Sequence, residues 1–80
     1  MARLVFLGRL EDIAGVPDLT VPLHAPTALA DVLTTLPPAL SEALAGPKVR
    51  LARNGELVAA NGLMVNEADE LAFLPPVSGG

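Results

Sequence analysis

The sequence ends in the stretch Asp69-Glu70-Leu71-Ala72-Phe73-Leu74-Pro75-Pro76-Val77-Ser78-Gly79-Gly80. Its first part passes from two acidic residues into an apolar run, which is typical of a buried strand over residues 70–74. Proline has no backbone N–H, so the proline pair ends the sheet ladder and favours an extended exit from the domain. The two last glycines lack a Cβ and can thread a narrow channel. We therefore predict a final strand followed by an extended tail.

This tail is the candidate reactive element. A carboxylate at Gly80 is accessible to a partner's active site, although it must be activated before it reacts. The composition of residues 78–80 alone also fits a frayed chain end, but the strand and the proline pair before it favour a functional tail. We predict a domain over residues 1–76 and a flexible diglycine tail over residues 77–80, which becomes ordered when a partner holds it.

Two strands are predicted near the N-terminus. Residues 3–10 form a short apolar run that ends at acidic residues. Leu19, Val21 and Leu23 then alternate with polar residues or proline, as in a strand with one buried face. Pro22 places this second strand at a sheet edge, because proline cannot donate to a ladder. We expect the two strands to form an antiparallel hairpin.

One main helix is predicted in the middle of the chain, with Thr27 as its N-cap. Apolar residues then follow at the spacing of one helical face, namely Leu29, Val32, Leu33 and Leu36. The prolines at positions 37 and 38 end this helix, and residues 39–44 form a second short helical turn.

The pattern then returns to strands. One strand is predicted around Val49 and Leu51, Asn54-Gly55 is a strong signal for a hairpin turn, and a return strand begins at Leu57. Together with the final strand, these elements predict an α+β domain, a small mixed sheet with one main helix packed on one face.

The composition favours a small carrier or binding module. Eighty residues make one domain with little room for a buried catalytic pocket. Hydrophobic residues make up 51% of the chain, yet only Phe6 and Phe73 are aromatic, so the core must be mostly aliphatic. Because a chain this small cannot hide so many apolar side chains, we expect an exposed apolar patch that binds a partner.

Several kinds of site are excluded. The chain has no cysteine, which excludes disulfides, thiolate metal sites and a cysteine nucleophile, and His24 cannot form a metal site alone. A net charge of −4 disfavours nucleic acid as a partner. Arg50 and Arg53 fit a solvated strand face, and Asp69-Glu70 fits a turn better than an acid–base pair. The N-terminal apolar run is too short for a signal peptide or a membrane span, so we expect a cytoplasmic protein without membrane contact.

The segment from Asp69 to Gly80 resembles the ending of the MoaD family, the small subunits of molybdopterin synthase, within the wider ThiS/MoaD group of ubiquitin-like sulfur carriers. Weaker similarity extends to the Val5-Phe6-Leu7 strand and to the Asn54-Gly55 turn. The Pro-Pro-Val-Ser-Gly-Gly ending is the specific part, because related carriers of the thiamine and cysteine pathways share the diglycine but usually lack the proline pair. Ala68 departs from the family, which usually has glycine there, and an alanine at positive φ would be strained.

The resemblance implies a β-grasp (ubiquitin-like) fold and a role in molybdenum cofactor biosynthesis. In that role an E1-like adenylating enzyme (MoeB-like) activates Gly80 with ATP, and a sulfur donor protein converts it to a thiocarboxylate. The thiocarboxylate then passes sulfur to a cyclic pterin precursor in the large subunit of molybdopterin synthase (MoaE-like), with which relatives form a heterotetramer. The chain would be a non-catalytic sulfur-donor subunit that binds no cofactor or metal itself, with the catalytic residues in the large subunit and ATP used in trans.

The resemblance also assigns site residues. Gly80 is the reactive terminus, and Gly79 allows the tail to thread. The surface that docks on the large subunit and on the activating enzyme is expected to comprise Leu7, Leu57, Phe73, Leu74, Pro75, Pro76 and Val77. Each apolar strand residue also fits an ordinary core position, and Leu74, next to the tail, is the strongest candidate for docking.

Three classes of function stay open. The first is a sulfur carrier, for molybdopterin or for thiamine, cysteine or tRNA thiolation; the second is a ubiquitin-like modifier attached to lysines; the third is a β-grasp binding module without tail chemistry. The first two share an adenylated diglycine and differ in product, a thiocarboxylate or an isopeptide. The third is disfavoured because a module that uses only its sheet has no need of a diglycine after a proline pair.

Overall fold

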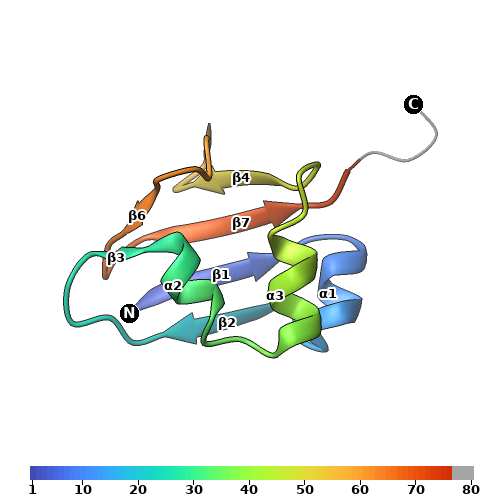
Figure 1. Cartoon of the computed structure of the whole chain (residues 1–80), viewed down its shortest axis with the longest axis horizontal. Helices are drawn as coiled ribbons and strands as arrows, with labels where there is room; N and C mark the ends of the chain where they lie inside the picture. The colour runs from blue at the N-terminus through green and yellow to red at the C-terminus, as the bar shows by residue number, and fades with distance from the viewer. Residues whose placement is uncertain (77–80) are drawn as a thin grey trace.

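A five-stranded mixed sheet forms the frame of the computed structural model, which describes residues 1–76 (Figure 1). Its strand order is β2-β1-β7-β4-β5. The strands are β1 (Ala2–Phe6), β2 (Asp18–Val21), β4 (Arg50–Arg53), β5 (Glu56–Val58) and β7 (Glu70–Leu74). β1 and β7 run parallel, and the other neighbours in this sheet are antiparallel. This is the α+β, β-grasp architecture that the sequence predicts, with the predicted final strand at its centre.

The first predicted strand is shorter than the sequence indicates, because β1 ends at Phe6 and residues 9–14 form the helix α1 (Arg9–Ala14). Gly8 lies between them with φ 55° and ψ −136°, a conformation that only glycine adopts without strain. Leu10, predicted as part of the strand, is instead buried on the helix. The predicted antiparallel pairing of β1 with the edge strand β2 is confirmed, although α1 connects the two strands in place of a turn.

The main helix is shorter than the sequence predicts. The central helix α2 (Leu29–Leu33) has only five residues. It directly follows β3 (Thr27–Ala28), which pairs with β6 (Met64–Val65) in a small second sheet. Thr27 is therefore not its N-cap, and the Thr27 hydroxyl donates to the Ala25 carbonyl. α2 ends early because the amides of residues 35 and 36 bond to carbonyls three residues back, the tighter 3₁₀ pattern, ahead of the prolines. The predicted second helical segment is α3 (Pro38–Leu44).

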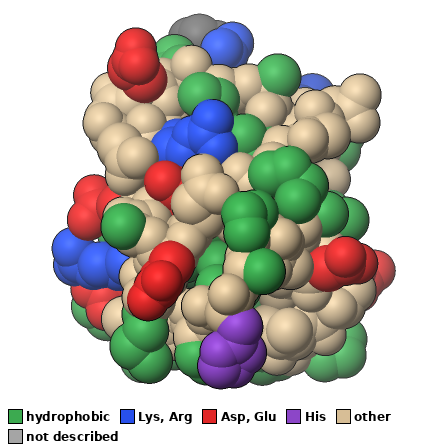
Figure 2. Space-filling model, turned by 90° about the vertical axis from the view of Figure 1, so that its left-hand side faces the viewer, with side chains coloured by type: hydrophobic (Ala, Val, Ile, Leu, Met, Phe, Trp, Pro, Cys, Tyr) green, Lys and Arg blue, Asp and Glu red, His purple; other side chains and the backbone are tan. Residues whose placement is uncertain are grey.

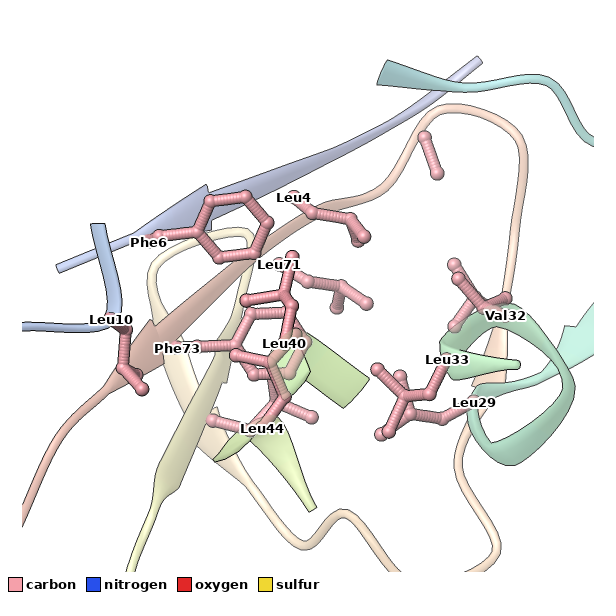
Figure 3. Packing of buried hydrophobic residues seen from close by; sticks show 13 residues of the cluster. Leu4, Phe6, Leu10, Leu29, Val32, Leu33, Leu40, Leu44, Leu71 and Phe73 are labelled. Carbon is pink, nitrogen blue, oxygen red and sulfur yellow. The ribbon is translucent and has the colours of Figure 1, made fainter. Parts of the chain in front are cut away.

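The core lies between one face of the sheet and the three helices (Figure 3). The strands contribute Leu4, Phe6, Leu51, Leu71 and Phe73, and the helices contribute Leu10, Leu29, Val32, Leu33, Leu40 and Leu44. The rings of Phe6 and Phe73 stack with their centroids 6.1 Å apart. Because neighbouring strands bury every second residue on this side, the alternate residues of β1, β7 and β4 lie on the opposite, helix-free face.

The turn between β4 and β5 follows the predicted Asn54-Gly55 signal, with φ 50° and 89° at its two residues, as in a two-residue hairpin. The Asn54 side chain donates to Asp69 and accepts a bond from the Glu70 amide, which fastens the hairpin to the start of β7. Among the residues that the structure describes, Asn54 is the one non-glycine residue with positive φ. The alanine at position 68 is therefore unstrained.

Candidate functional site

The centre of the sheet determines where the tail leaves the domain. β7 pairs with β1 on one side and with β4 on the other, and the Leu7 amide extends the ladder by donating to the Phe73 carbonyl at 3.1 Å. Pro75 and Pro76 follow outside the strand, both partly buried. The chain therefore leaves the sheet from a strand that is held on both edges, so the start of the tail has a fixed position.

Gly8 supports the first residue of this exit. A Cβ built on Gly8 would lie 2.9 Å from Cγ of Pro75, closer than real Cβ contacts come, and φ at Gly8 is +55°. Position 8 thus requires glycine for two reasons, the positive φ of its backbone and the close approach of the Pro75 ring. This role of Gly8 was not predicted from the sequence, where the available signal is a single glycine shortly after an apolar run.

An apolar surface, here called the docking face, occupies the helix-free side of the sheet next to the exit. Pairing across the sheet aligns Val5 with Ala72, Ala72 with Ala52, and Ala52 with Leu57. Leu74, at the end of β7, and Leu7, which follows β1 and continues its ladder, lie two residues after Ala72 and Val5 and extend the same face. The most exposed of these side chains are Leu57, at 64%, and Leu7, at 41%. The predicted docking residues Leu7, Leu57 and Leu74 thus come together, and Val5, Ala52 and Ala72, which the sequence analysis missed, connect them.

Phe73 does not belong to the docking face. Its side chain is 2% exposed and lies in the core against Phe6 (Figure 3), because alternation along β7 turns it toward the helices. The expectation that Phe73 contacts a partner is corrected accordingly. Pro75 and Pro76 lie beside the docking face, whereas Val77, Gly79 and Gly80 lie outside the described residues.

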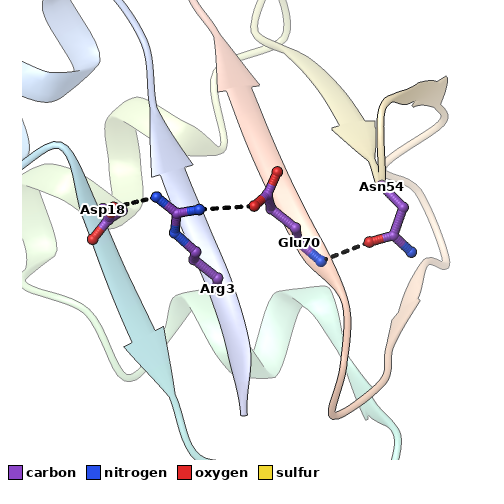
Figure 4. Close-up of polar contacts among 4 residues, drawn as sticks. All are labelled: Arg3, Asp18, Asn54 and Glu70. Carbon is purple, nitrogen blue, oxygen red and sulfur yellow. Dashed lines mark hydrogen bonds and ion pairs between the residues drawn. The ribbon is translucent and has the colours of Figure 1, made fainter.

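Charged residues border the docking face at the opposite end of the strands. Arg3 donates to Asp18 at 2.6 Å and to Glu70 at 2.9 Å, bridging three neighbouring strands (Figure 4). The hydrogen bond and charge of Asp18, followed by the charge of Glu70, raise the pKa of the Arg3 guanidinium. The helices lie behind the sheet in Figure 4, so this view is of the helix-free side. The ion pairs are exposed and stabilise the fold only modestly.

The remaining polar candidates have structural or solvated positions. His24 is exposed, and the histidine side chain lies at the lower edge of the end shown in Figure 2. Arg53, expected on a solvated face, instead donates to the Met64 carbonyl at 2.9 Å and lies 3.8 Å from Asp69. The Asp69 carboxylate is nearly buried and accepts from the Asn66 amide, so it shapes the turn before β7.

Two absences hold for residues 1–76. No group of three or more histidine or acidic side chains could hold a metal ion. In the same residues, no helix has the length and apolar character that crossing a membrane requires.

The fold is shared with known archaeal proteins. SAMP1 from Haloferax volcanii is 30% identical, with a TM-score of 0.81 over 99% of this chain and 98% of that one. The small archaeal modifier protein 1 (SAMP1) from Methanosarcina acetivorans is 26% identical, with a TM-score of 0.69 over 99% and 95% of the two chains. A putative molybdopterin converting factor, subunit 1, from Pyrococcus furiosus has a TM-score of 0.71 over 95% and 97%, but its 19% identity shows likeness of fold alone.

The sequence comparison reaches the family level. No curated protein matches the chain. The model of the ThiS family matches residues 4–80, which include the docking face, the proline pair and the diglycine. Since this match spans nearly the whole sequence and the fold agrees with it, the chain belongs to the ThiS family.

Proposed function

We propose that this chain is a sulfur carrier of molybdopterin synthase whose reactive group is the carboxylate of Gly80. The observation that carries the proposal is the position of the exit. The chain leaves a central strand at Leu74, and the docking face lies around that point. A partner that covers the docking face therefore receives the tail at the same time, so one docking event delivers the carboxylate.

The chemistry follows from the poor reactivity of a carboxylate. Adenylation by an activating enzyme joins AMP to the Gly80 carboxylate and releases pyrophosphate from ATP. A persulfide on a donor protein then displaces AMP and forms an acyl disulfide with the Gly80 carbonyl. A thiol attacks the donor's own sulfur, which releases the thiocarboxylate and leaves a disulfide on the donor. The thiocarboxylate supplies its sulfur to the pterin precursor in the large subunit, and hydrolysis returns the carboxylate. In this scheme the chain presents its tail, and the partners supply the catalytic groups and the ATP site.

The proline pair of the tail, followed by Val77, Ser78 and the diglycine, is what favours molybdopterin synthase over the other sulfur pathways. The same docking face and a diglycine tail would also serve a carrier for thiamine, cysteine or tRNA thiolation. Only the identity of the sulfur acceptor therefore depends on the sequence of the tail. Both the activating enzyme and the large subunit need the tail, so their binding to one carrier molecule is mutually exclusive.

A ubiquitin-like protein modifier is the second candidate, and a specific observation favours it. The H. volcanii protein, SAMP1, at 30% identity, shares 98% of its length with this chain, and the related M. acetivorans structure is described as a small archaeal modifier protein. A modifier also begins with an adenylated C-terminus. The two functions diverge afterwards, when sulfur or a lysine amine takes the activated carboxyl group.

The intact mass of the chain separates these functions. The protein is expressed in its source organism at native level, purified under non-reducing, denaturing conditions, and measured by mass spectrometry. We expect a species in which one sulfur replaces one oxygen at the C-terminus. Recovery of the chain only as an isopeptide on lysines of other proteins would favour the modifier. A mass that shows residues beyond Gly80, or an unreacted carboxylate throughout, would contradict the proposal.

The docking face makes a second prediction. Replacing Leu57 by Thr removes the most exposed apolar side chain of this face while keeping a residue suited to strands. We expect the affinity for the large subunit, measured by calorimetry, to fall about tenfold or more, as for an apolar residue at the centre of an interface. The midpoint of thermal unfolding should change little, as for most substitutions at exposed positions.

Met64 provides the matched control. It is 46% exposed but lies on β6, away from the docking face. Met64→Thr should therefore leave the affinity unchanged. Equal losses from the two substitutions would show that exposed apolar side chains act non-specifically, and an unchanged affinity for Leu57→Thr would remove Leu57 from the interface.

A further inference from the structure

A groove of about 910 Å³ opens beside the tail exit. Its walls are the segment from the end of α3 into β4, residues 45–51, and the segment from β5 onward, residues 57–60, with Pro76 completing the lining. Leu57 lines the groove and also belongs to the docking face. Arg50 lines it as well and is paired with Leu74 across β4 and β7. The groove is therefore continuous with the docking face and reaches the last described residue of the chain.

The groove is cationic in an acidic protein. Lys48 and Arg50 both line it and both are exposed, and none of its lining residues is acidic. The chain as a whole has nine acidic residues against five basic ones. Within residues 1–76, neither Lys48 nor Arg50 forms an ion pair, whereas Arg3 and Arg53 do. Two cations without an ion-pair partner in residues 1–76 thus line the same groove as Pro76.

The reach of the tail limits what can lie against this groove. Four residues follow Pro76, and four extended residues span at most about 14 Å. An enzyme that reacts with the Gly80 carboxylate must therefore bring the mouth of its tail channel close to Pro76. The groove is lined by Pro76, so the surface around that mouth meets Lys48 and Arg50.

We infer that the groove receives an acidic segment at the rim of the tail channel of the adenylating enzyme. This rests on the proposed activation of Gly80, a step that the sulfur carrier and the modifier share. Carboxylates of the partner would pair with Lys48 and Arg50 while apolar side chains cover Leu57. Because the carrier is acidic overall, such a partner is repelled by most of its surface and attracted by this groove. The charge pattern therefore orients the approach and raises the association rate.

Charge reversal at the groove tests the inference. Lys48→Glu and Arg50→Glu are compared with wild type in carrier-dependent release of pyrophosphate from ATP by the adenylating enzyme of the source organism. We expect each variant to raise the KM for the carrier about tenfold at low salt, with kcat unchanged, because rim charges act mainly on association. The difference from wild type should shrink as salt screens the attraction.

Arg9→Glu is the control with the same change of charge. Arg9 is exposed on α1 and does not line the groove, so its reversal should change KM less than twofold. Equal effects of all three reversals would overturn the inference in favour of net charge alone, and unchanged KM for the groove variants would overturn it outright. If the wild-type chain supports no release of pyrophosphate, the proposed activation itself fails, which is a separate result.

Discussion

Deletion of Gly80 is expected to abolish thiocarboxylate formation while leaving the folded domain intact. All strands, helices and core side chains that the structure describes lie within residues 1–76. The free energy of unfolding should therefore change by no more than roughly 0.5 kcal/mol, as for neutral surface changes. The activity should vanish because the shortened carboxylate no longer reaches the reacting centre, and a misplacement of about 1 Å already costs on the order of a hundredfold in rate. Mass spectrometry after incubation with the activating enzyme and a sulfur donor measures loading.

Two further variants separate the effect of tail length from the effect of side-chain bulk. Ser78→Ala keeps the length and adds no bulk, so it should load at the wild-type rate. Gly79→Val keeps the length but adds a branched side chain next to the terminus, which should obstruct a narrow channel. Wild-type loading by the Gly80 deletion would refute the assignment of the reactive group.

Replacement of Gly8 by Ala is expected to damage both the fold and the delivery of the tail. The new Cβ would lie 2.9 Å from Cγ of Pro75, and φ at this position is +55°. Strained backbone of this kind costs about 1–3 kcal/mol, and the contact adds to it. Since a domain of this size has a total stability of roughly 4–12 kcal/mol, the thermal midpoint should fall by about 5–20 °C. At a temperature where the variant is still folded, loading should also slow, because Pro75 must move.

Gly15→Ala separates these two causes. Gly15 also has positive φ, at +78°, but a Cβ there would meet nothing within 4 Å. It should lose about 1 kcal/mol through its backbone alone and should load normally once folded. If both variants loaded at the wild-type rate, Gly8 would matter for the fold and not for the position of the tail. Differential scanning calorimetry and the loading assay together decide this.

Local signals in the sequence predict the parts of the fold that depend on few residues. The strand over residues 70–74 and the turn at Asn54-Gly55 were predicted with their observed bounds, because proline and the Asn-Gly pair each impose a backbone geometry. The break at Gly8 was missed, since the apolar residues before it and Leu10 after it continue a strand-like run. Only the folded backbone shows that Gly8 turns the chain into a helix.

The sequence predicts the tail of the candidate site more completely than the surface around it. Residues 71–74 are all apolar, so the sequence does not tell which of them point to the core; the register of β7 with β1 and β4 decides that Phe73 is buried and that Leu74 is not. Lys48 and Arg50 were equally out of reach, because the groove joins segments that are separated in the chain. In both cases the prediction would need the contacts between segments that are far apart in the sequence.

The central position of β7 also determines when this protein can fold during its synthesis. β1 finds its parallel partner only when Glu70 to Leu74 have been made, so that Arg3 pairs with a residue 67 positions later. Contacts between such distant segments are slow to form and cannot begin on a partial chain. A product truncated before β7 lacks the middle of its sheet and half of the Phe6–Phe73 stack. Such a product cannot complete the docking face, because Ala72 and Leu74 both belong to β7.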